Sequence, residues 1–238
     1  MFSAGSANDS WELQLSGASQ FIIQLNKLLD HIKYNFEILD VNDFKTNHSE
    51  LGEILLNNKS DKSFFPWHNY HIFYAYVFDK LGRNSMLNIL EIGLGTNNPN
   101  LPSYMGDGAR PGASLYAWRE YFPNSNIYGG DIDKDILFED DRIKTFYLDQ
   151  LDIKTFQVLP DIKYDLIIDD GLHSIGANFN TLLYALDHIN INGWIIIEDI
   201  SIQENWRAID FILQSTRKYK THMICALRGY IYAIQKIM

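Results

Sequence analysis

Apolar residues recur along the chain with two spacings. Between residues 19 and 33, and again between 68 and 80, they lie three or four residues apart, which predicts helices with one buried face. From residue 87 onward the apolar residues instead form short runs separated by polar, helix-like segments. Five of these runs predict strands, at 87–92, 126–130, 143–147, 164–168 and 194–197. Strands that alternate with helices predict a mostly parallel sheet with helices on both faces.

The last two apolar runs, 222–226 and 230–234, are separated by only three residues. A connection this short cannot cross over a sheet, so the two runs predict an antiparallel hairpin. The predicted fold is therefore α/β and Rossmann-like: a mostly parallel seven-stranded sheet with a C-terminal antiparallel hairpin and an N-terminal helical extension. The polar stretch 57–62 marks the predicted boundary between this extension, residues 1–62, and the main domain, residues 63–238.

The composition limits what this domain can bind. At 238 residues and 46% hydrophobic content, the chain is long and apolar enough for one large core. The formal charge of −10 argues against nucleic acid as a partner, because binding to polyphosphates depends on cationic contacts. No apolar run approaches the roughly 18 residues of a membrane span, and residues 1–10 lack the parts of a leader. We expect a soluble, cytoplasmic protein without a membrane partner, and a buried rather than catalytic thiol at Cys225, the single cysteine.

Acidic residues end several of the predicted strands. The first strand runs into the motif EIGLG at residues 91–95, whose glycines let the backbone approach a ligand closely. Later strands end at Asp131, Asp169, Asp170, Glu198 and Asp199. Ligands bind beyond the carboxyl ends of the strands in an open parallel sheet, so we expect these acids to converge on one crevice.

The residues after the glycines indicate which cofactor the crevice binds. A dinucleotide site has a third glycine that opens a helix at once, so that a pyrophosphate can bind the helix N-terminus. Here Gly95 is followed by a long loop rich in Asn, Pro and Gly, and the next predicted helix spans 112–121. A cofactor without phosphates, S-adenosylmethionine, suits this loop better. Asp131 could bind its ribose hydroxyls and Asp149 its adenine amino group; a helix N-cap and a surface loop are the respective alternatives.

Asp170, Glu198 and Asp199 predict a metal site. Three carboxylates on adjacent strand ends repel one another unless a cation joins them, and oxygen ligands suit Mg²⁺ or another hard divalent cation. The alternative is that these acids cap the helices that follow them. His173 lies three residues beyond Asp170, which makes it a candidate general base.

These motifs, together with the segments 98–103 and 111–119, resemble class I S-adenosylmethionine-dependent methyltransferases. Within that class the chain is most similar to the metal-dependent macrolide sugar O-methyltransferases of the mycinamicin and tylosin type, over about residues 65–235. The resemblance implies that Asp170, Glu198 and Asp199 bind Mg²⁺, and that His173 and Asp170 are the catalytic residues. The predicted donor-binding residues are Glu91, Gly93, Gly95, Asn97, Ser103, Asp131, Ile132, Asp149 and Asp169.

The resemblance implies methyl transfer to a hydroxyl of a sugar or sugar-like small molecule. Mg²⁺ would lower the pKa of the acceptor hydroxyl, and His173 would remove its proton. The expected acceptor is a sugar, a nucleotide sugar or a related polyol of bacterial surface-polysaccharide or natural-product biosynthesis. The chain is shorter than these enzymes, so neither the acceptor nor the oligomeric state carries over, and a homo-oligomer stays an open alternative.

Three other functions remain open at this point. One is methylation of a phosphorylated or phosphoramidate-bearing capsule intermediate, and the second is a hydroxylase resembling the cephalosporin hydroxylases. The third, a noncatalytic subunit that binds S-adenosylmethionine, is the least favoured, because a binding module has no need of clustered acids. The aromatic residues within 64–71 could pack on a sugar ring, but packing in the core is the favoured interpretation.

Overall fold

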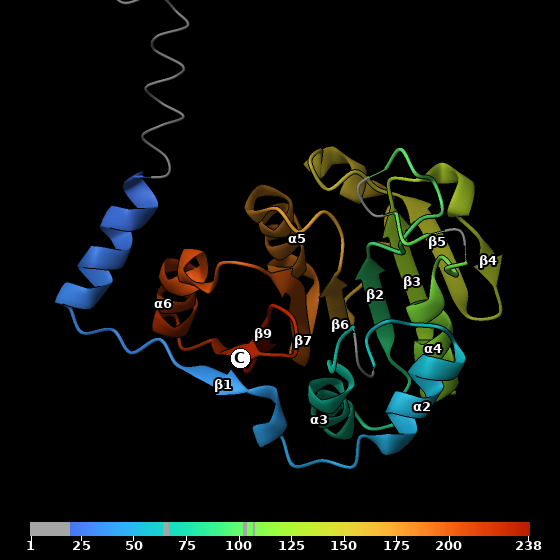
Figure 1. The fold of residues 1–238 in the computed structure, drawn as a ribbon, viewed down its shortest axis with the longest axis horizontal. Coiled ribbons are helices and arrows are strands. Elements are labelled where there is room, and N and C mark those ends of the chain that lie inside the picture. The colour runs from blue at the N-terminus through green and yellow to red at the C-terminus, as the bar shows by residue number, and fades with distance from the viewer. Residues whose placement is uncertain (1–19, 64–66, 102–103, 107) are drawn as a thin grey trace, which may run out of the picture.

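The computed structural model describes residues 20–63, 67–101, 104–106 and 108–238 of the chain. These residues contain one nine-stranded sheet with the order β1-β8-β9-β7-β6-β2-β3-β5-β4 (Figure 1). Its strands are β1 (Ile38–Asp40), β2 (Asn88–Ile92), β3 (Asn126–Asp131), β4 (Glu139–Asp140), β5 (Ile143–Tyr147), β6 (Tyr164–Asp169), β7 (Ile189–Ile200), β8 (Tyr219–Cys225) and β9 (Tyr230–Lys236). β4 and β9 run opposite to the other strands.

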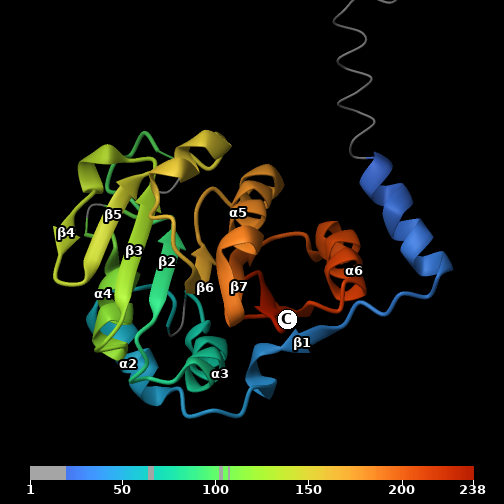
Figure 2. The same ribbon diagram turned by 180° about the vertical axis from the view of Figure 1, so that it is seen from behind.

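Helices cover both faces of the sheet. On one face lie α2 (Ser49–Asn57), α3 (His71–Leu81) and α4 (Ala113–Tyr121), and on the other lie α5 (Ile175–His188) and α6 (Arg207–Ser215), as Figure 2 shows from behind. Short 3-10 helices occupy connections: η1 (Val41–Asp43), η2 (Lys134–Ile136), η3 (Ile153–Val158) and η4 (Gln203–Trp206). A further helix at residues 20–31 lies outside these layers, beside α6 (Figure 1).

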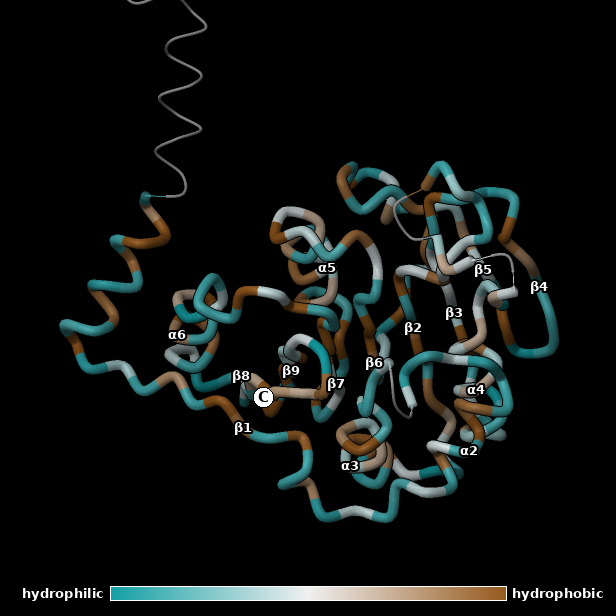
Figure 3. The backbone as a smooth tube through the Cα atoms, viewed as in Figure 1, coloured by the Kyte–Doolittle hydropathy of each residue, from teal (hydrophilic) through white to brown (hydrophobic). Residues whose placement is uncertain are grey.

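Alternate residues of the central strands enter two hydrophobic cores. Ile89 and Ile168 pack with residues of α3 and α4, whereas Leu90 and Ile167 pack with residues of α5. Successive side chains of a strand point to opposite faces, so a run that is apolar throughout is buried on both sides. Figure 3 shows that the apolar segments concentrate on the strands and the polar segments on the outer loops.

The strand register brings several strand ends to one edge. Ile92 of β2 lies beside Gly130 of β3 and Asp169 of β6, and Asp169 lies beside Ile197 of β7. The residues that follow these four positions therefore begin at the same edge of the sheet. This alignment is what places acids from three different strands within reach of one another.

Most of the predicted fold is confirmed. The parallel strands, the covering helices and the C-terminal hairpin of β8 and β9 form as expected. The count of seven strands is wrong, because β1 pairs with β8 and β4 pairs with β5. With three and two residues, β1 and β4 are too short to show an alternating pattern. The division at residue 62 stays a prediction, and β1 joins part of the N-terminal extension to the sheet.

The prediction that the Cys225 thiol is buried is also wrong, because Cys225 is exposed. It is the last residue of β8, opposite Asp40 of β1 and Tyr230 of β9. Met223 and Ile224, which precede it, are buried. Burial therefore ends at Ile224, two residues before the apolar run 222–226 does.

Gly93 joins the turn after β2 to the turn after β6. Its φ is +93°, and a Cβ at this position would lie 2.0 Å from the carbonyl oxygen of Asp170. The Gly93 amide donates to the Gly130 carbonyl at 2.8 Å, and the Asp170 amide donates to the Ile92 carbonyl at 2.8 Å. No other residue type fits this approach of two backbones without displacing one of them.

We predict that Gly93→Ala lowers the free energy of unfolding by about 2–4 kcal/mol, because the new methyl group meets backbone and the positive φ is strained. Gly176→Ala is the matched control, since a Cβ at Gly176 in α5 meets nothing within 4 Å. Its effect should stay within about 1 kcal/mol and be stabilising. Urea unfolding followed by circular dichroism measures both changes. Equal stability of the two variants would contradict the close approach.

Candidate active site

Two cavities lie at the carboxyl edge of the sheet. The narrow cavity, of about 300 Å³, is lined by residues of β2 and β3 and of the loops after β5 and β6. The wide cavity, of about 600 Å³, is lined by the loops after β2, β6 and β8, by Asp199 near the end of β7 and by residues between α2 and α3. Gly93, Gly171 and His173 line both cavities. His173 therefore stands where the two cavities meet.

The narrow cavity has an apolar lining with carboxylates at Asp131 and Asp149. The Asp131 side chain is 4% exposed, and it accepts hydrogen bonds from the amides of Leu94 (2.7 Å) and Asp133 (2.8 Å). Burial raises the pKa of Asp131, while these two backbone donors oppose the rise. Each oxygen keeps a lone pair for a ligand hydroxyl. A mostly apolar pocket with a few placed polar groups is typical of a small-molecule site.

Ile132 and Asp149 also line the narrow cavity, as predicted for donor-binding residues. Ile132 is 44% exposed. Asp149 Oδ1 accepts from the Leu151 amide at 2.9 Å, which turns the chain after β5 and leaves the other carboxylate oxygen available. The structure thus brings Asp131, Ile132 and Asp149 together around one cavity.

Glu91 and Asp169 lie beneath the cavities and not on their walls. Both side chains are fully buried. Asp169 accepts from Gln150 Nε2 at 2.8 Å and from Asn178 Nδ2 at 3.1 Å, so it holds the loop after β5 and the start of α5. Asp169 thus positions the residues that face a ligand.

Glu91 has a similar structural role beneath the loop after β2. It accepts from Ser114 Oγ at 2.8 Å and from Trp118 Nε1 at 2.5 Å, both on α4. Glu91 therefore holds the first helix after the glycine motif against the end of β2. A carboxylate with two good donors and full burial is a structural anchor.

The remaining predicted donor residues belong to the loop after β2. Gly95 lines the wide cavity, and its φ of +68° is a left-handed conformation. The Asn97 side chain donates to the Ala109 carbonyl at 3.1 Å, which ties the two ends of the loop together. Ser103 lies outside the described residues.

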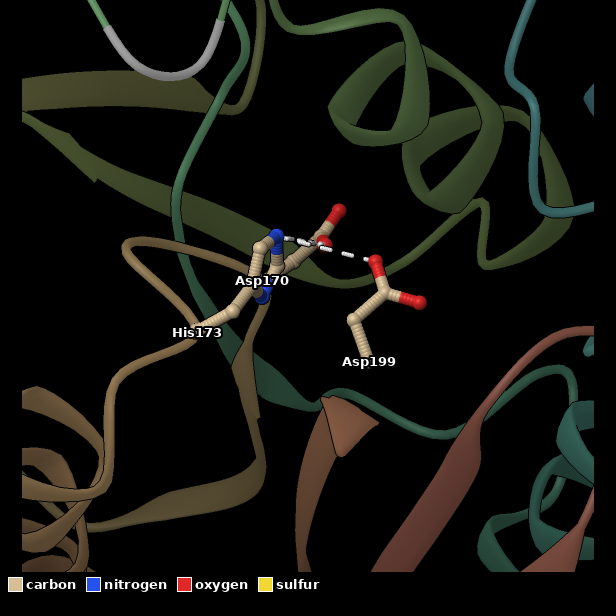
Figure 4. Close-up of side chains that lie close together, drawn as sticks. All are labelled: Asp170, His173 and Asp199. Carbon is tan, nitrogen blue, oxygen red and sulfur yellow. Dashed lines mark ion pairs between the residues drawn. The ribbon is translucent and has the colours of Figure 1, made fainter. Parts of the chain in front are cut away.

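Asp170, His173 and Asp199 point toward one another on the wall of the wide cavity (Figure 4). One carboxylate oxygen of each aspartate and one ring nitrogen of His173 lie within 4.8 Å of one another. His173 Nε2 is 3.6 Å from Asp199 Oδ2 and 3.9 Å from Asp170 Oδ1. These atoms are close enough to share one small cation.

Unusual backbone geometry aims two of these side chains. Asp199 and His173 have φ values of +53° and +55°, which cost non-glycine residues about 1–3 kcal/mol each. The pairing of β7 with β9 shifts between Ile197 and Ile200, and such irregularities redirect side chains. The Tyr70 hydroxyl then holds Asp199 by donating to its Oδ1 at 2.5 Å.

Lys62 occupies the centre of the acid cluster. Its side chain is 2% exposed, and its ammonium lies 2.5 Å from Asp170 Oδ2, 2.6 Å from Glu198 Oε2 and 3.4 Å from Glu91 Oε1. It therefore bridges carboxylates from the ends of β2, β6 and β7. The polar stretch predicted as a linker thus ends in a buried ion-pair network. The hydroxyl of Tyr74, from α3, donates to the other oxygen of Glu198.

The pKa shifts of the cluster reflect the burial of its groups and the opposing effect of their unlike charges. Burial alone would lower the pKa of Lys62, but Asp170, Glu198 and Glu91 outweigh it and hold that pKa well above its usual value. Burial raises the pKa of Glu198 to about 7 although Lys62 opposes the rise. It also raises the pKa of Asp170 in the same way. One ammonium does not offset the burial of these carboxylates.

The predicted metal ligands fit a hard divalent cation. Asp170 Oδ1 and Asp199 Oδ2 lie together with a ring nitrogen of His173, whereas Glu198, the residue before Asp199 in β7, lies outside this group. Each Glu198 oxygen already accepts one hydrogen bond, from Tyr74 or from Lys62, and each keeps a second lone pair. All three groups are carboxylates, the donors that such cations prefer.

Lys62, Tyr70 and Tyr74 are site residues that the sequence reasoning missed. Lys62 stands in a polar stretch that looks like a solvated loop, and the two tyrosines look like core residues. Tyr70 is indeed buried, as the interpretation of segment 64–71 expected. Trp67, from the same segment, does not pack in the core as expected: its side chain is 55% exposed and lines the wide cavity. Residues 64–66 lie outside the described residues.

No protein-family model matches the chain. Among curated proteins, 8-demethyl-8-(2-methoxy-alpha-L-rhamnosyl)-tetracenomycin-C 3'-O-methyltransferase of Streptomyces olivaceus is 29% identical over 154 residues, which cover 63% of this chain and 37% of that protein. Mycinamicin VI 2''-O-methyltransferase of Micromonospora griseorubida is 34% identical over 121 residues, which cover 50% of this chain and 28% of that protein. The chain thus matches between 28% and 37% of the length of these two relatives.

Among solved structures, the MycE methyltransferase of the mycinamycin pathway, in complex with Mg and SAH, matches 82% of this chain with a TM-score of 0.64 and 23% identity. The match covers 56% of that chain. The chain therefore has the fold of a class I methyltransferase. The resemblance to macrolide sugar O-methyltransferases is confirmed, because the curated relatives carry such names.

None of the helices in the described part of the chain is long and apolar enough to cross a membrane.

We predict that Lys62→Met lowers the free energy of unfolding by about 3–5 kcal/mol, because it leaves buried carboxylates without their counter-ion. Lys59→Met is the matched control: Lys59 borders the same wide cavity, but its side chain is exposed. This control should change stability by no more than about 0.5 kcal/mol. Urea titrations at neutral pH, without divalent cations, measure both variants. A Lys62 variant as stable as the control would show that the ion-pair network does not form.

Proposed function

We propose that this chain is an S-adenosylmethionine- and Mg²⁺-dependent O-methyltransferase that acts on a hydroxyl of a sugar or sugar-like small molecule. The observation that carries the proposal is the position of His173 at the junction of two cavities, beside Asp170 and Asp199. One cavity can hold a donor and the other an acceptor, with a base between them. The names of the curated relatives support the same reaction.

The methyl donor occupies the narrow cavity. Asp131 lies at the end of β3, where a carboxylate can accept hydrogen bonds from both hydroxyls of a ribose. Asp149 and Ile132 lie beside it, so an adenine ring can pack on apolar side chains and donate its amino group to Asp149. Gly93 leaves the space over the end of β2 open, which lets the sulfonium end of the donor reach the junction.

The acceptor occupies the wide cavity. Asp170, Glu198 and Asp199 would hold Mg²⁺ there, and the bound metal would lower the pKa of a coordinated hydroxyl. His173 lines the same cavity, with its Nε2 within 4 Å of both aspartates, and can take the proton. Lys62 and Tyr74 hold Glu198, and Tyr70 holds Asp199, so the carboxylates are fixed before a ligand binds.

The names of the curated relatives support a glycosylated natural product as the acceptor's origin. We place the reaction in the biosynthesis of a glycosylated natural product or a bacterial surface polysaccharide, in the cytoplasm. The partners are then small molecules, and the net charge of −10 gives no basis for nucleic-acid binding.

His173→Gln should lower the rate of methyl transfer by about 10²–10⁴-fold, the usual contribution of a general base, while donor affinity changes little. His31→Gln, at an exposed position in the N-terminal helix, is the control and should keep full activity. The assay supplies S-adenosylmethionine, Mg²⁺ and a panel of sugars, nucleotide sugars and polyols, and detects the methyl group by mass spectrometry. Calorimetry measures donor binding separately. Full turnover in the His173 variant would exclude it as the base.

Asp170→Asn and Asp199→Asn should each weaken Mn²⁺ binding by at least about tenfold, because a neutral amide replaces a charged ligand. Asp141→Asn is the control, since that carboxylate is 78% exposed and lies outside both cavities. Mn²⁺ titrations followed by electron paramagnetic resonance measure the affinity without requiring turnover. Chelation should also abolish methyl transfer and added Mg²⁺ should restore it. Activity that survives chelation, or iron-dependent oxygen consumption, would contradict the proposal.

A further inference from the structure

The rim of the wide cavity carries cations that have no acidic partner. Lys59, Arg110 and Arg228 line this cavity, and all three are exposed. None of them forms an ion pair with a described residue. In a protein with a net charge of −10, three exposed cations that form no ion pair are unexpected at one cavity.

The arginines of the chain differ in whether they form an ion pair. Of the seven arginines in the sequence, four pair with an aspartate or glutamate: Arg83, Arg119, Arg142 and Arg207. Two of the remaining three, Arg110 and Arg228, line the wide cavity. The third, Arg217, follows α6 and lines neither cavity.

Aromatic rings position both cavity arginines, and Asp140, whose pKa Arg110 helps to lower, forms its ion pair with Arg119 and not with Arg110. The Arg228 guanidinium lies 5.4 Å from the ring centre of Trp67, and the Arg110 guanidinium lies 3.7 Å from that of Tyr116. Tyr116 in turn stacks on Phe138 with an interplanar angle of 3°. Such contacts hold a guanidinium in place and leave its N–H donors free for an anion.

The rest of the cavity explains why separate cations are needed for an anionic ligand. Asp61, Asp170 and Asp199 line the same cavity; Asp61 is exposed, whereas Asp170 and Asp199 are partly buried. These acids would repel an anion, whereas guanidinium groups outside ion pairs bind phosphate oxygens through paired hydrogen bonds. The cavity is thus acidic where the hydroxyl is to react, and its exposed charged lining holds three cations and one acid.

We infer that the acceptor carries a phosphate or pyrophosphate group, as a sugar 1-phosphate or a nucleoside diphosphate sugar does. This inference rests on the proposed function. The reacting hydroxyl lies at Asp170, His173 and Asp199, and the phosphate binds among the exposed cations that line the same cavity, Arg228, Arg110 and Lys59. The exposed ring of Trp67 lies at the same rim and offers a stacking surface for the sugar or base.

The test compares hexoses in three forms: the free sugar, the 1-phosphate and the nucleoside diphosphate derivative. We expect KM for the phosphorylated forms to be about 10- to 100-fold lower than for the free sugar, the range expected for charge-assisted hydrogen bonds. Arg228→Gln and Arg110→Gln should remove this advantage and leave kcat and the KM of the free sugar unchanged. Arg217→Gln is the matched control and should behave as the unaltered protein does.

A binding experiment separates failure of the inference from failure of the proposed function. Inorganic pyrophosphate is titrated calorimetrically into the full-length protein without divalent cations, with no methyl transfer involved. Binding that weakens about tenfold or more in Arg228→Gln, and not in Arg217→Gln, supports the inference even if no sugar in the panel is methylated. Three results would overturn the inference: no binding of pyrophosphate, equal KM values for free and phosphorylated sugars, or an equal rise in KM for the free and the phosphorylated sugar in Arg228→Gln.

Discussion

The arrangement of the site depends on the contact of one buried ammonium with three carboxylates. Lys62 reaches Glu91, Asp170 and Glu198, which come from the ends of three adjacent strands. Without a positive charge there, these acids would repel one another in a place that water hardly reaches. The segment before α3 therefore belongs to the site as much as the strand ends do, although it lies far from them in the sequence.

The sequence predicts the parts of the fold that have a long, regular pattern. The central strands are apolar throughout because both of their faces are covered, and the three-residue connection before Tyr230 allows only a hairpin. The strands β1 and β4 escape prediction because a pattern of two or three residues carries no periodicity. The exposure of Cys225 could not be predicted either, because the position along β8 at which side chains become exposed depends on the neighbouring strands.

Only part of the candidate site, like only part of the fold, could be predicted from the sequence. The clustering of Asp170 and Asp199 with His173 could be predicted, since strand ends in a parallel sheet meet at one edge. The structural roles of Glu91 and Asp169 could not be predicted, because a buried carboxylate and one that faces a ligand look alike in a sequence. Lys62 could not be found either, because a lysine in a polar stretch is ordinarily solvated.

The two cavities draw their residues from different kinds of backbone. Groups that would carry the chemistry belong to strand ends or the turns beside them, where the sheet register fixes them. The rim residues Lys59, Arg110 and Arg228 belong to connecting loops, which tolerate change far better than strands do. Under the proposed function, acceptor preference can therefore diverge in evolution by exchange of loop residues alone, and the rim is the natural target for redesigning which acceptor is methylated.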